Sequence, residues 1–591
     1  QLSNAGDMQI PQGTVVKWSF QTQDVEQLSL AIADTSLEAE RVSETNFQYK
    51  KQFYKSSPYA ISGKNKFIAS KDTLRYFIDV VPDLYPSIEL EQRTDSVSSK
   101  RVYFKGYIKD DYGLTQLTFN YRFLNKEEDK TLHSEKIGFN INSNQDQFFH
   151  FWNLAPLNIE SGDEIEYYFE VWDNDGINGR KSSRSSKMVF KAPTLNELSE
   201  QTKKNNEEIK NDLQQSINSA KNIKKGLEDL NKKMLEKKNL GWEEKKKFDE
   251  LLEQQKELQK ELEQINQQNQ QNNQKNEEYR QIDERILEKQ EQLQKIFDEL
   301  MNEDLKKMFE EMEKLMERMD KNQLQQQLEQ MELKNEDLEK ELDRTLELFK
   351  QLEVEQKVDE LKNKLDDLAE KQEKLSEQTK NKELSKEELE KKQEELNKEF
   401  DKIQEDFKEL EEKNQELERP NEMPNTSDEQ KKIDENMEQG KEEISKGKNS
   451  KASEMQKQAS DDMKSLSDKL SQMQGQMSSQ QTGEDMENLR QILENLLRLS
   501  FDQEELMEKV KATNFTDPNY LALTQKQKQL KDASKVIQDS LFELSKRVVQ
   551  LQSIVNKEIN AINNNMDKAV EQMANRNTGV ATSRQQLAMT S

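Results

Sequence analysis

The chain has 591 residues and a formal net charge of −27, so phosphate backbones and anionic membrane surfaces should repel it. It contains no cysteine and only two histidines, His133 and His150. This excludes disulfides, thiolate zinc sites, cysteine nucleophiles and histidine-rich metal sites. Charged residues make up 35% and hydrophobic residues 32%, but leucine, isoleucine, methionine and phenylalanine recur at three- and four-residue spacing, which favours a helical array over disorder.

Residues 1–194 carry the signature of β-strands, because aromatic and β-branched residues alternate with polar ones. The run from Pro82 to Pro86 interrupts this pattern, since proline cannot donate to a strand ladder. The number and spacing of the strands predict two Ig-like β-sandwiches, at residues 1–84 and 85–194. Strands are expected at residues 15–20, 27–33, 46–54, 73–81, 101–109, 114–123, 146–152, 164–172 and 187–191.

One acidic turn resembles a calcium-binding loop. Asp173, Asp175 and Asn178 offer oxygen atoms at close spacing, as hard cations require. The EF-hand pattern, however, needs an oxygen donor where Ile177 stands and a glycine where Asn178 stands. Asn178 and Gly179 are typical of a tight hairpin turn, so a turn is favoured over a calcium site. The same two interpretations apply to residues 110–113, and no other metal site and no cofactor is expected.

Beyond Pro193 the pattern becomes helical. Residues 194–197 form a capping box, and no proline follows until Pro420. We predict long coiled-coil helices over residues 195–418, with a break near 239–242 at Gly241. One unbroken helix over this range would be about 300 Å long. Because the apolar seams change phase along the chain, we expect antiparallel reversals instead.

The remaining helices are punctuated by proline and glycine. A proline-containing loop is expected at residues 419–427, followed by methionine-rich jointed helices at 428–516. Residues 447–450 and 475–483 are expected to be flexible joints. Asp517 and Pro518 give a strong start signal for a C-terminal helix at 517–574, and residues 575–591 are expected to be a flexible tail.

No enzymatic motif is recognisable, and we predict that the protein is not an enzyme. The fragments nearest to a phosphate-binding loop, at residues 62–65 and 446–450, lack its first glycine and its correctly placed hydroxyl. Carboxylates are abundant, but solvated helix faces do not supply the pocket that acid–base chemistry needs.

Two methionine-rich stretches allow two interpretations. Methionine suits adaptable binding of exposed apolar segments, but it also fills helical seams. In residues 301–319 the methionines lie at seam positions of the heptad pattern, which favours a packed helical seam over a binding surface. Residues 455–477 have weaker heptads and are the better candidate for an adaptable surface.

Six phrases stand out when taken in order: GTVVKW (13–18), VVPDLYPSI (80–88), GYIKDDYGL (106–114), the turn at 170–179, LGWEEK (240–245) and FKQLEVEQ (349–356). Together they resemble a family of large, uncharacterised envelope proteins of Bacteroidota. The resemblance implies N-terminal membrane helices, Ig-like β domains and a very long Glu/Lys/Gln-rich helical region in the periplasm. This chain departs from the family pattern by lacking the membrane helices. Since it begins at Gln1 rather than methionine, we expect an inner-membrane anchor in a segment outside it.

These observations lead to a functional hypothesis. The protein is predicted to be a non-enzymatic periplasmic scaffold or tether of the bacterial cell envelope. It would act through coiled-coil seams that bind protein partners or a second copy within a larger assembly, and it would not bind nucleic acid. The alternative hypothesis is a periplasmic holdase-like chaperone for outer-membrane or exported clients.

Overall fold

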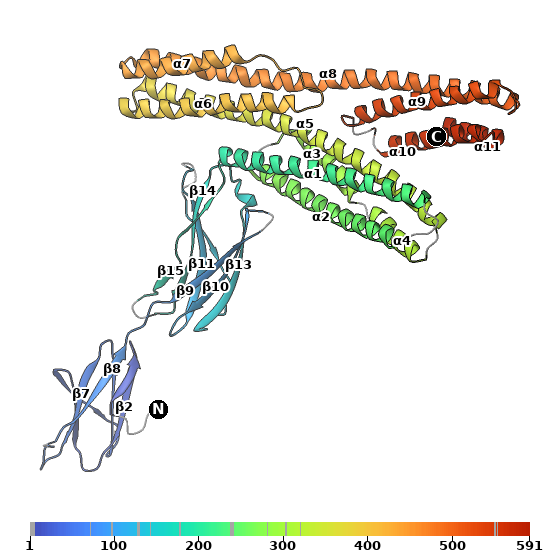
Figure 1. The fold of residues 1–591 in the computed structure, drawn as a ribbon. Coiled ribbons are helices and arrows are strands. Elements are labelled where there is room, and N and C mark those ends of the chain that lie inside the picture. Colours follow the sequence, from blue (N-terminus) through green and yellow to red (C-terminus); the bar gives the residue numbers. More distant parts are fainter. Residues whose placement is uncertain are drawn as a thin grey trace. The chain divides into compact units, whose positions relative to one another are not determined.

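A computed structural model describes residues 6–590 apart from 71, 96–97, 127–130, 142, 177–178, 237–240, 280–281, 302–303, 319–320, 549–550 and 552. The chain divides into two compact units, Gln1–Thr194 and Leu195–Ser591. The described strands lie in the first unit and the long helices in the second (Figure 1). This confirms the predicted order of β-sheet domains followed by long helices.

The first β domain has two sheets around one core. A five-stranded sheet has the order β1-β8-β7-β3-β4, with β1 parallel to β8, and a three-stranded sheet has the order β2-β6-β5. Trp18, Phe47, Leu30 and Ile78 point from these sheets into the shared core, since side chains alternate between the faces of a strand. The strands are β1 (Met8–Pro11), β2 (Val15–Gln21), β3 (Gln27–Ile32), β4 (Thr35–Glu38), β5 (Glu40–Arg41), β6 (Asn46–Gln52), β7 (Ser57–Lys64) and β8 (Leu74–Val81).

The second β domain is built around aromatic rings. Its sheets have the orders β13-β10-β9 and β12-β11-β14-β15, and β16 also pairs with β14. Phe104 and Phe148 of one sheet meet Phe169 of the other at ring-centroid distances of 5.0 and 5.3 Å. Gly106 is required here, because a Cβ atom would lie 2.3 Å from the Phe148 ring. The strands are β9 (Ser87–Thr94), β10 (Arg101–Lys109), β11 (Leu114–Phe123), β12 (His133–Lys136), β13 (Gln145–Asn153), β14 (Glu164–Asp173), β15 (Ser182–Arg184) and β16 (Met188–Lys191).

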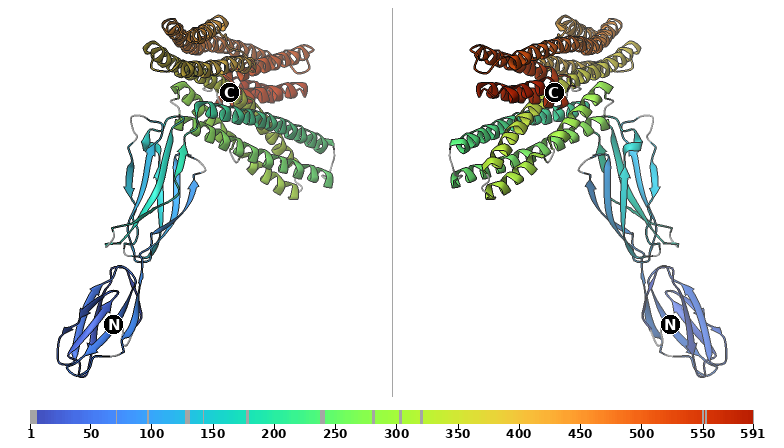
Figure 2. Two further views of the ribbon diagram at one scale, coloured as in Figure 1. Left: turned by 90° about the vertical axis from the view of Figure 1, so that its left-hand side faces the viewer. Right: turned by 90° about the vertical axis from the view of Figure 1, so that its right-hand side faces the viewer.

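The helices of the second unit lie side by side (Figure 2). Side-chain pairs such as Thr202–Asn276 and Asn205–Asn272 join residues of rising and falling number, so α1 and α2 are antiparallel. The structure thereby confirms the expected reversals. The helices are α1 (Leu195–Glu236), α2 (Trp242–Tyr279), α3 (Glu284–Leu300), α4 (Asp304–Arg318), α5 (Lys321–Asn381), α6 (Lys386–Gln415), α7 (Ser427–Ser445), α8 (Asn449–Ala512), α9 (Asn519–Ser545), α10 (Ser553–Ala574) and α11 (Thr578–Thr590).

Helix α5 is shared by two hydrophobic cores. Its first part, including Leu342 and Leu352, packs with α1, α3 and α4 in the first core, which α2 completes. Its second part, including Leu361 and Leu365, packs with α6 and α8 in the second core, which α7 completes. With 61 residues, α5 is about 90 Å long and continues from one core into the other.

Buried glutamines form layers within these apolar seams. Gln393 of α6 exchanges hydrogen bonds with Gln372 of α5 at 2.9 and 3.1 Å, and its Oε1 also accepts from Gln456 of α8 at 2.9 Å. A buried polar residue that is satisfied in only one alignment specifies the register of packed helices. The layer therefore selects one alignment of α5, α6 and α8.

A buried ionic network joins α5 to α6 and to α1. The Glu360 carboxylate lies 2.6 Å from the Lys364 ammonium and 3.6 Å from that of Lys357, and it accepts a hydrogen bond from Ser199 of α1. Asp406 of α6 binds both lysines. Burial alone would raise the pKa of Glu360, but the two ammonium groups outweigh burial and lower this pKa to about 2.

Three expectations for the C-terminal part are wrong. Residues 475–483 are not a flexible joint, because α8 continues through them. A glycine inside a helix costs only about 1 kcal/mol. The packing of α8 against the second core, for example through Met473, outweighs this cost. The predicted helix at 517–574 is divided between Ser545 and Ser553, so that α10 folds back on α9. The predicted flexible tail contains α11, because Gln585 joins the buried glutamine layer of Gln503 and Gln527.

We predict that Leu365→Ala destabilises the helical unit by about 2–5 kcal/mol, because it leaves a cavity in the second core. Leu333→Ala, on an exposed position of the same helix, should change stability by no more than about 0.5 kcal/mol. Urea unfolding followed by circular dichroism at 222 nm measures both variants. Equal losses for the two variants would contradict the packing described for α5.

The Glu360 network predicts an acid-sensitive stability. The folded-state pKa lies below the ordinary value of 4.5, so the contribution is present above pH 4.5 and is lost as the pH falls toward 2. The shift corresponds to about 3 kcal/mol. Glu360→Gln should therefore be less stable than the wild type near neutral pH, and this difference should shrink on acidification. Glu395→Gln, an exposed control in α6, should follow the wild type at every pH. A Glu360→Gln difference that stays constant from pH 7 to pH 3 would refute the proposed linkage.

Candidate functional site

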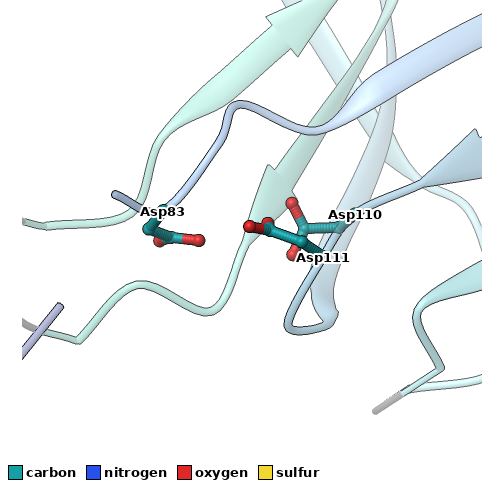
Figure 3. Close-up of side chains that lie close together, drawn as sticks. All are labelled: Asp83, Asp110 and Asp111. Carbon is teal, nitrogen blue, oxygen red and sulfur yellow. The ribbon is translucent and has the colours of Figure 1, made fainter. Parts of the chain in front are cut away.

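Three carboxylates meet at one end of the second β domain. Asp83 lies in the segment between β8 and β9, and Asp110 and Asp111 begin the loop between β10 and β11. Figure 3 shows the three side chains pointing toward one another. Each offers an oxygen atom, and these oxygens all lie within 4.8 Å of one another.

The local backbone holds two of these carboxylates in place. Asp110 Oδ2 accepts hydrogen bonds from the backbone amides of Tyr112 and Gly113, at 3.0 and 2.8 Å. This turn needs Gly113, whose φ of +138° is strained for residues with a side chain. Asp111 Oδ2 accepts from the backbone amide of Leu84 at 3.4 Å, which joins the loop to the β8–β9 segment.

Lys181 connects Asp83 to the predicted calcium-loop turn. Its ammonium lies 2.8 Å from Asp83, 3.5 Å from Asp173 and 3.6 Å from Asp175. It also donates hydrogen bonds to the backbone carbonyls of Asp83 and Leu84. The ammonium therefore joins the β8–β9 segment to the turn that follows β14.

The turn after β14 is built around Asp173. Asp173 Oδ1 accepts from the backbone amides of Asp175 and Lys181, at 3.1 and 2.8 Å. Asn178, the third predicted ligand, lies outside the described residues. The structure thus places Asp173 and Asp175 around the ammonium that also binds Asp83, and Asn174 donates a hydrogen bond to the Tyr112 carbonyl of the neighbouring loop. Sequence analysis missed Asp83, because no motif links it to a loop 27 positions away.

The electrostatics of the cluster reflect unbalanced negative charge. Burial raises the pKa of Asp83; Lys181 opposes this effect, and the charges of Asp111 and Asp173 add to it. Burial also raises the pKa of Tyr112, and the charges of Asp111 and Asp83 raise it further. Burial alone would lower the pKa of Lys181, but its carboxylate partners raise it. The arrangement can attract a cation, and its side chains offer only oxygen ligands apart from the ammonium.

A second candidate surface lies on α8. Met486, Leu493, Leu497 and Phe501 are 69, 52, 60 and 67% exposed. Their spacings of seven, four and four residues place them within about 80° of one another around the helix axis. We call these four residues the α8 stripe. Leu493 and Leu497 also line a groove whose other wall comes from α10 and α11, including Ile562, Met566 and Met589.

Where the structure describes the methionine side chains of these two stretches, three are buried and three partly buried. Met312 is fully buried in the first core, and Met308 and Leu315 pack against it, as the seam interpretation predicted. Met463 and Met473 are buried in the second core. The expected adaptable surface is therefore wrong for Met463 and Met473, because α8 packs them against α5 and its neighbours.

Comparisons with known proteins add little. No protein-family model and no curated protein matches the chain. Among solved structures, the chain is similar to the fibronectin(III)-like modules of Clostridium thermocellum CbhA, at 11% identity, over 32% of this chain and 91% of that chain, with a TM-score of 0.13. Among the described helices, none combines the length and apolarity needed to cross a bilayer.

We predict that Lys181→Met destabilises the second β domain by about 3 kcal/mol, because it leaves buried carboxylates without their counter-charge. Lys187→Met removes a lysine of the same domain that pairs with Glu166 but is 54% exposed, so it should cost less than about 1 kcal/mol. Thermal unfolding followed by tryptophan fluorescence compares the two. Equal melting temperatures would show that Lys181 does not hold the cluster together.

Proposed function

We propose that the protein is a non-enzymatic scaffold or tether of the bacterial cell envelope that acts by helix–helix association. The observation that carries this proposal is the α8 stripe, an apolar helical face that remains exposed while the seams of the two cores that share α5 are packed within the chain. In this proposal the β domains are Ig-like sandwiches and the helices form a coiled-coil array.

The architecture of the helical unit supports a positional role. Its long helices share continuous cores, and buried glutamine layers select one alignment. Buried ionic contacts such as Lys413–Glu353 add further alignment-specific partners. Such features specify shape more than they add stability, since a buried ion pair contributes little net free energy. A defined shape is what a scaffold needs in order to set distances between its partners.

The α8 stripe has the geometry of a helix-docking face. Apolar residues at spacings of seven and four form a straight line along a helix, which a second amphipathic helix can cover. The flanking charges pair with each other, since Arg490 lies 2.9 Å from Glu487 and 3.4 Å from Glu494. We therefore propose an amphipathic helix of an envelope protein as the occupant of the stripe.

The proposed location rests on the family resemblance described above. That resemblance implies a periplasmic protein with an inner-membrane anchor in a segment outside this chain. The proposal of no enzymatic activity rests on the sequence, where the nearest phosphate-loop fragments lack required residues.

The burial of the methionines favours a scaffold over a holdase. A holdase would need wide apolar faces open to unfolded clients. Met312, Met463 and Met473 instead lie inside the two cores. The α8 stripe is narrow and linear, which suits one defined helix better than varied clients.

The proposal predicts specific crosslinks from the α8 stripe. A photo-crosslinking amino acid at Leu497, introduced into the protein in cells and followed by mass spectrometry, should trap one or a few defined envelope proteins. The same amino acid at Leu333, an exposed leucine on α5, is the matched control and should not trap them. Leu493→Glu should reduce the Leu497 crosslinks at least about fivefold, because burying a charge against an apolar helix is unfavourable.

The outcomes separate the alternatives. Crosslinks to many outer-membrane and exported proteins would favour the holdase. Crosslinks between two copies of this chain would assign the stripe to self-association. The absence of crosslinks beyond the Leu333 control would refute the proposed docking face.

A further inference from the structure

We propose that the second β domain binds a calcium ion between Asp83, Asp110 and Asp111. Asp110 and Asp111 belong to the β10–β11 loop, for which the sequence left both a turn and a cation site open. The third ligand, Asp83, comes from the β8–β9 segment, which no sequence motif indicated. It is also independent of the proposed scaffold function.

Each of the three carboxylates has one oxygen in use and one without a partner. The Oδ2 atom of Asp83 accepts from the Lys181 ammonium, and that of Asp111 accepts from the Leu84 amide. The Oδ2 atom of Asp110 accepts from two backbone amides. All three Oδ1 atoms are buried and have no hydrogen-bond partner among the described residues. A buried carboxylate oxygen without a partner is costly, so three together indicate that a ligand is missing from this set of contacts.

Asp110 gives the strongest indication. Asp110 is only 5% exposed, and its Oδ1 atom is one of the three buried oxygens without a hydrogen-bond partner. The carboxylate points toward that of Asp83 (Figure 3). The turn formed by its Oδ2 atom fixes this direction, because that oxygen is held by the amides of Tyr112 and Gly113. Asp110 is therefore a preorganised oxygen ligand.

The spacing of the oxygens suits calcium. Calcium binds oxygen at about 2.4 Å, so two of its ligands lie at most about 4.8 Å apart. The three carboxylate oxygens all satisfy this limit. Magnesium binds at about 2.1 Å and demands near-octahedral geometry, so it tolerates less variation in ligand spacing. Water would complete the six to eight ligands that calcium takes.

The charge balance also requires a cation. Lys181 lies near Asp83, Asp173 and Asp175, but it is a single positive charge. Neither Asp110 nor Asp111 has an ion-pair partner within the described part of the chain. Lys181 therefore neutralises one side of the cluster, and the calcium ion occupies the other side, where Asp83 is shared between the two cations.

Calcium binding would fasten the β8–β9 segment to the second β domain. Without the ion, Asp83 and Leu84 are held through Lys181 and Asp111. The ion adds a direct link from Asp83 to the Asp110 loop. Binding should therefore raise the melting temperature of this domain, because a ligand that binds only the folded state stabilises it.

Terbium luminescence tests the site on the full chain. Terbium(III) replaces calcium and emits when a nearby tyrosine is excited, and Tyr112 follows Asp111 directly. We expect sensitised emission from the EDTA-treated protein, and calcium should displace terbium with a Kd on the order of 10⁻⁴–10⁻³ M. Magnesium should be at least about tenfold weaker as a competitor.

Two variants and a control locate the ion. Asp110→Asn keeps an oxygen for the turn but removes a charge, and Asp111→Asn removes a charge from the neighbouring ligand. Each should weaken calcium binding by at least about tenfold, because calcium affinity depends on the number of charged ligands. Asp34→Asn, the same change in an exposed turn of the first β domain, should bind like the wild type.

Three results would overturn the proposal. The first is the absence of sensitised emission that calcium can displace in the wild-type protein. The second is wild-type affinity in both Asp110→Asn and Asp111→Asn. The third is an equal loss in Asp34→Asn, which would mean that terbium binds the acidic surface in general. A calcium-dependent rise in the melting temperature that Asp110→Asn abolishes would support the site independently of luminescence.

Discussion

The burial of apolar side chains along both halves of α5 is the constraint on which the helical unit depends. Leu324 to Leu352 belong to one core, and Val354 to Leu375 belong to the next, with no break in the helix between them. Each core holds its own helices together, and the continuous α5 connects the two cores. Ion pairs between α1 and α6, such as Lys203 with Glu409, add a second connection. The Glu360 network and the Gln372–Gln393–Gln456 layer lie on the second half of this helix and select its alignment.

The burial of apolar seams in these cores also indicates where a functional site can lie. Helices with a narrow apolar seam bury it against neighbours and leave charged faces in water. Once α5 has organised its partners, an apolar face that is still exposed, such as that of Leu493, Leu497 and Phe501, stands out as a site of association. The β domains supply a different kind of site, in which loops and a connecting segment bring acidic groups together.

The sequence predicted local features well and tertiary ones poorly. Alternation and proline placement located nine of the sixteen described strands and missed β1, β4, β5, β7, β9, β12 and β15. The capping-box pattern at Ser385 marks the start of α6 in the structure. The failures are those in which packing overrides local signals. Gly475 and Gly483 lie inside a helix, and α11 is ordered by the Gln503–Gln527–Gln585 contact, which no local pattern reveals. For the acidic site, the turns at Asp110 and Asp173 were recognisable, but the participation of Asp83 and the counter-charge of Lys181 depend on the fold.

The continuity of α5 decides whether the helical unit fixes distances, and the absence of cysteine makes this continuity directly measurable. Spin labels on cysteines introduced at the exposed positions Glu329 and Glu370 would bracket the boundary between the two cores. A continuous helix places them about 60 Å apart, so double electron–electron resonance should give one narrow distribution near that distance. A broad distribution, or one centred well below it, would mean that α5 bends between the cores and that the helical unit does not fix distances.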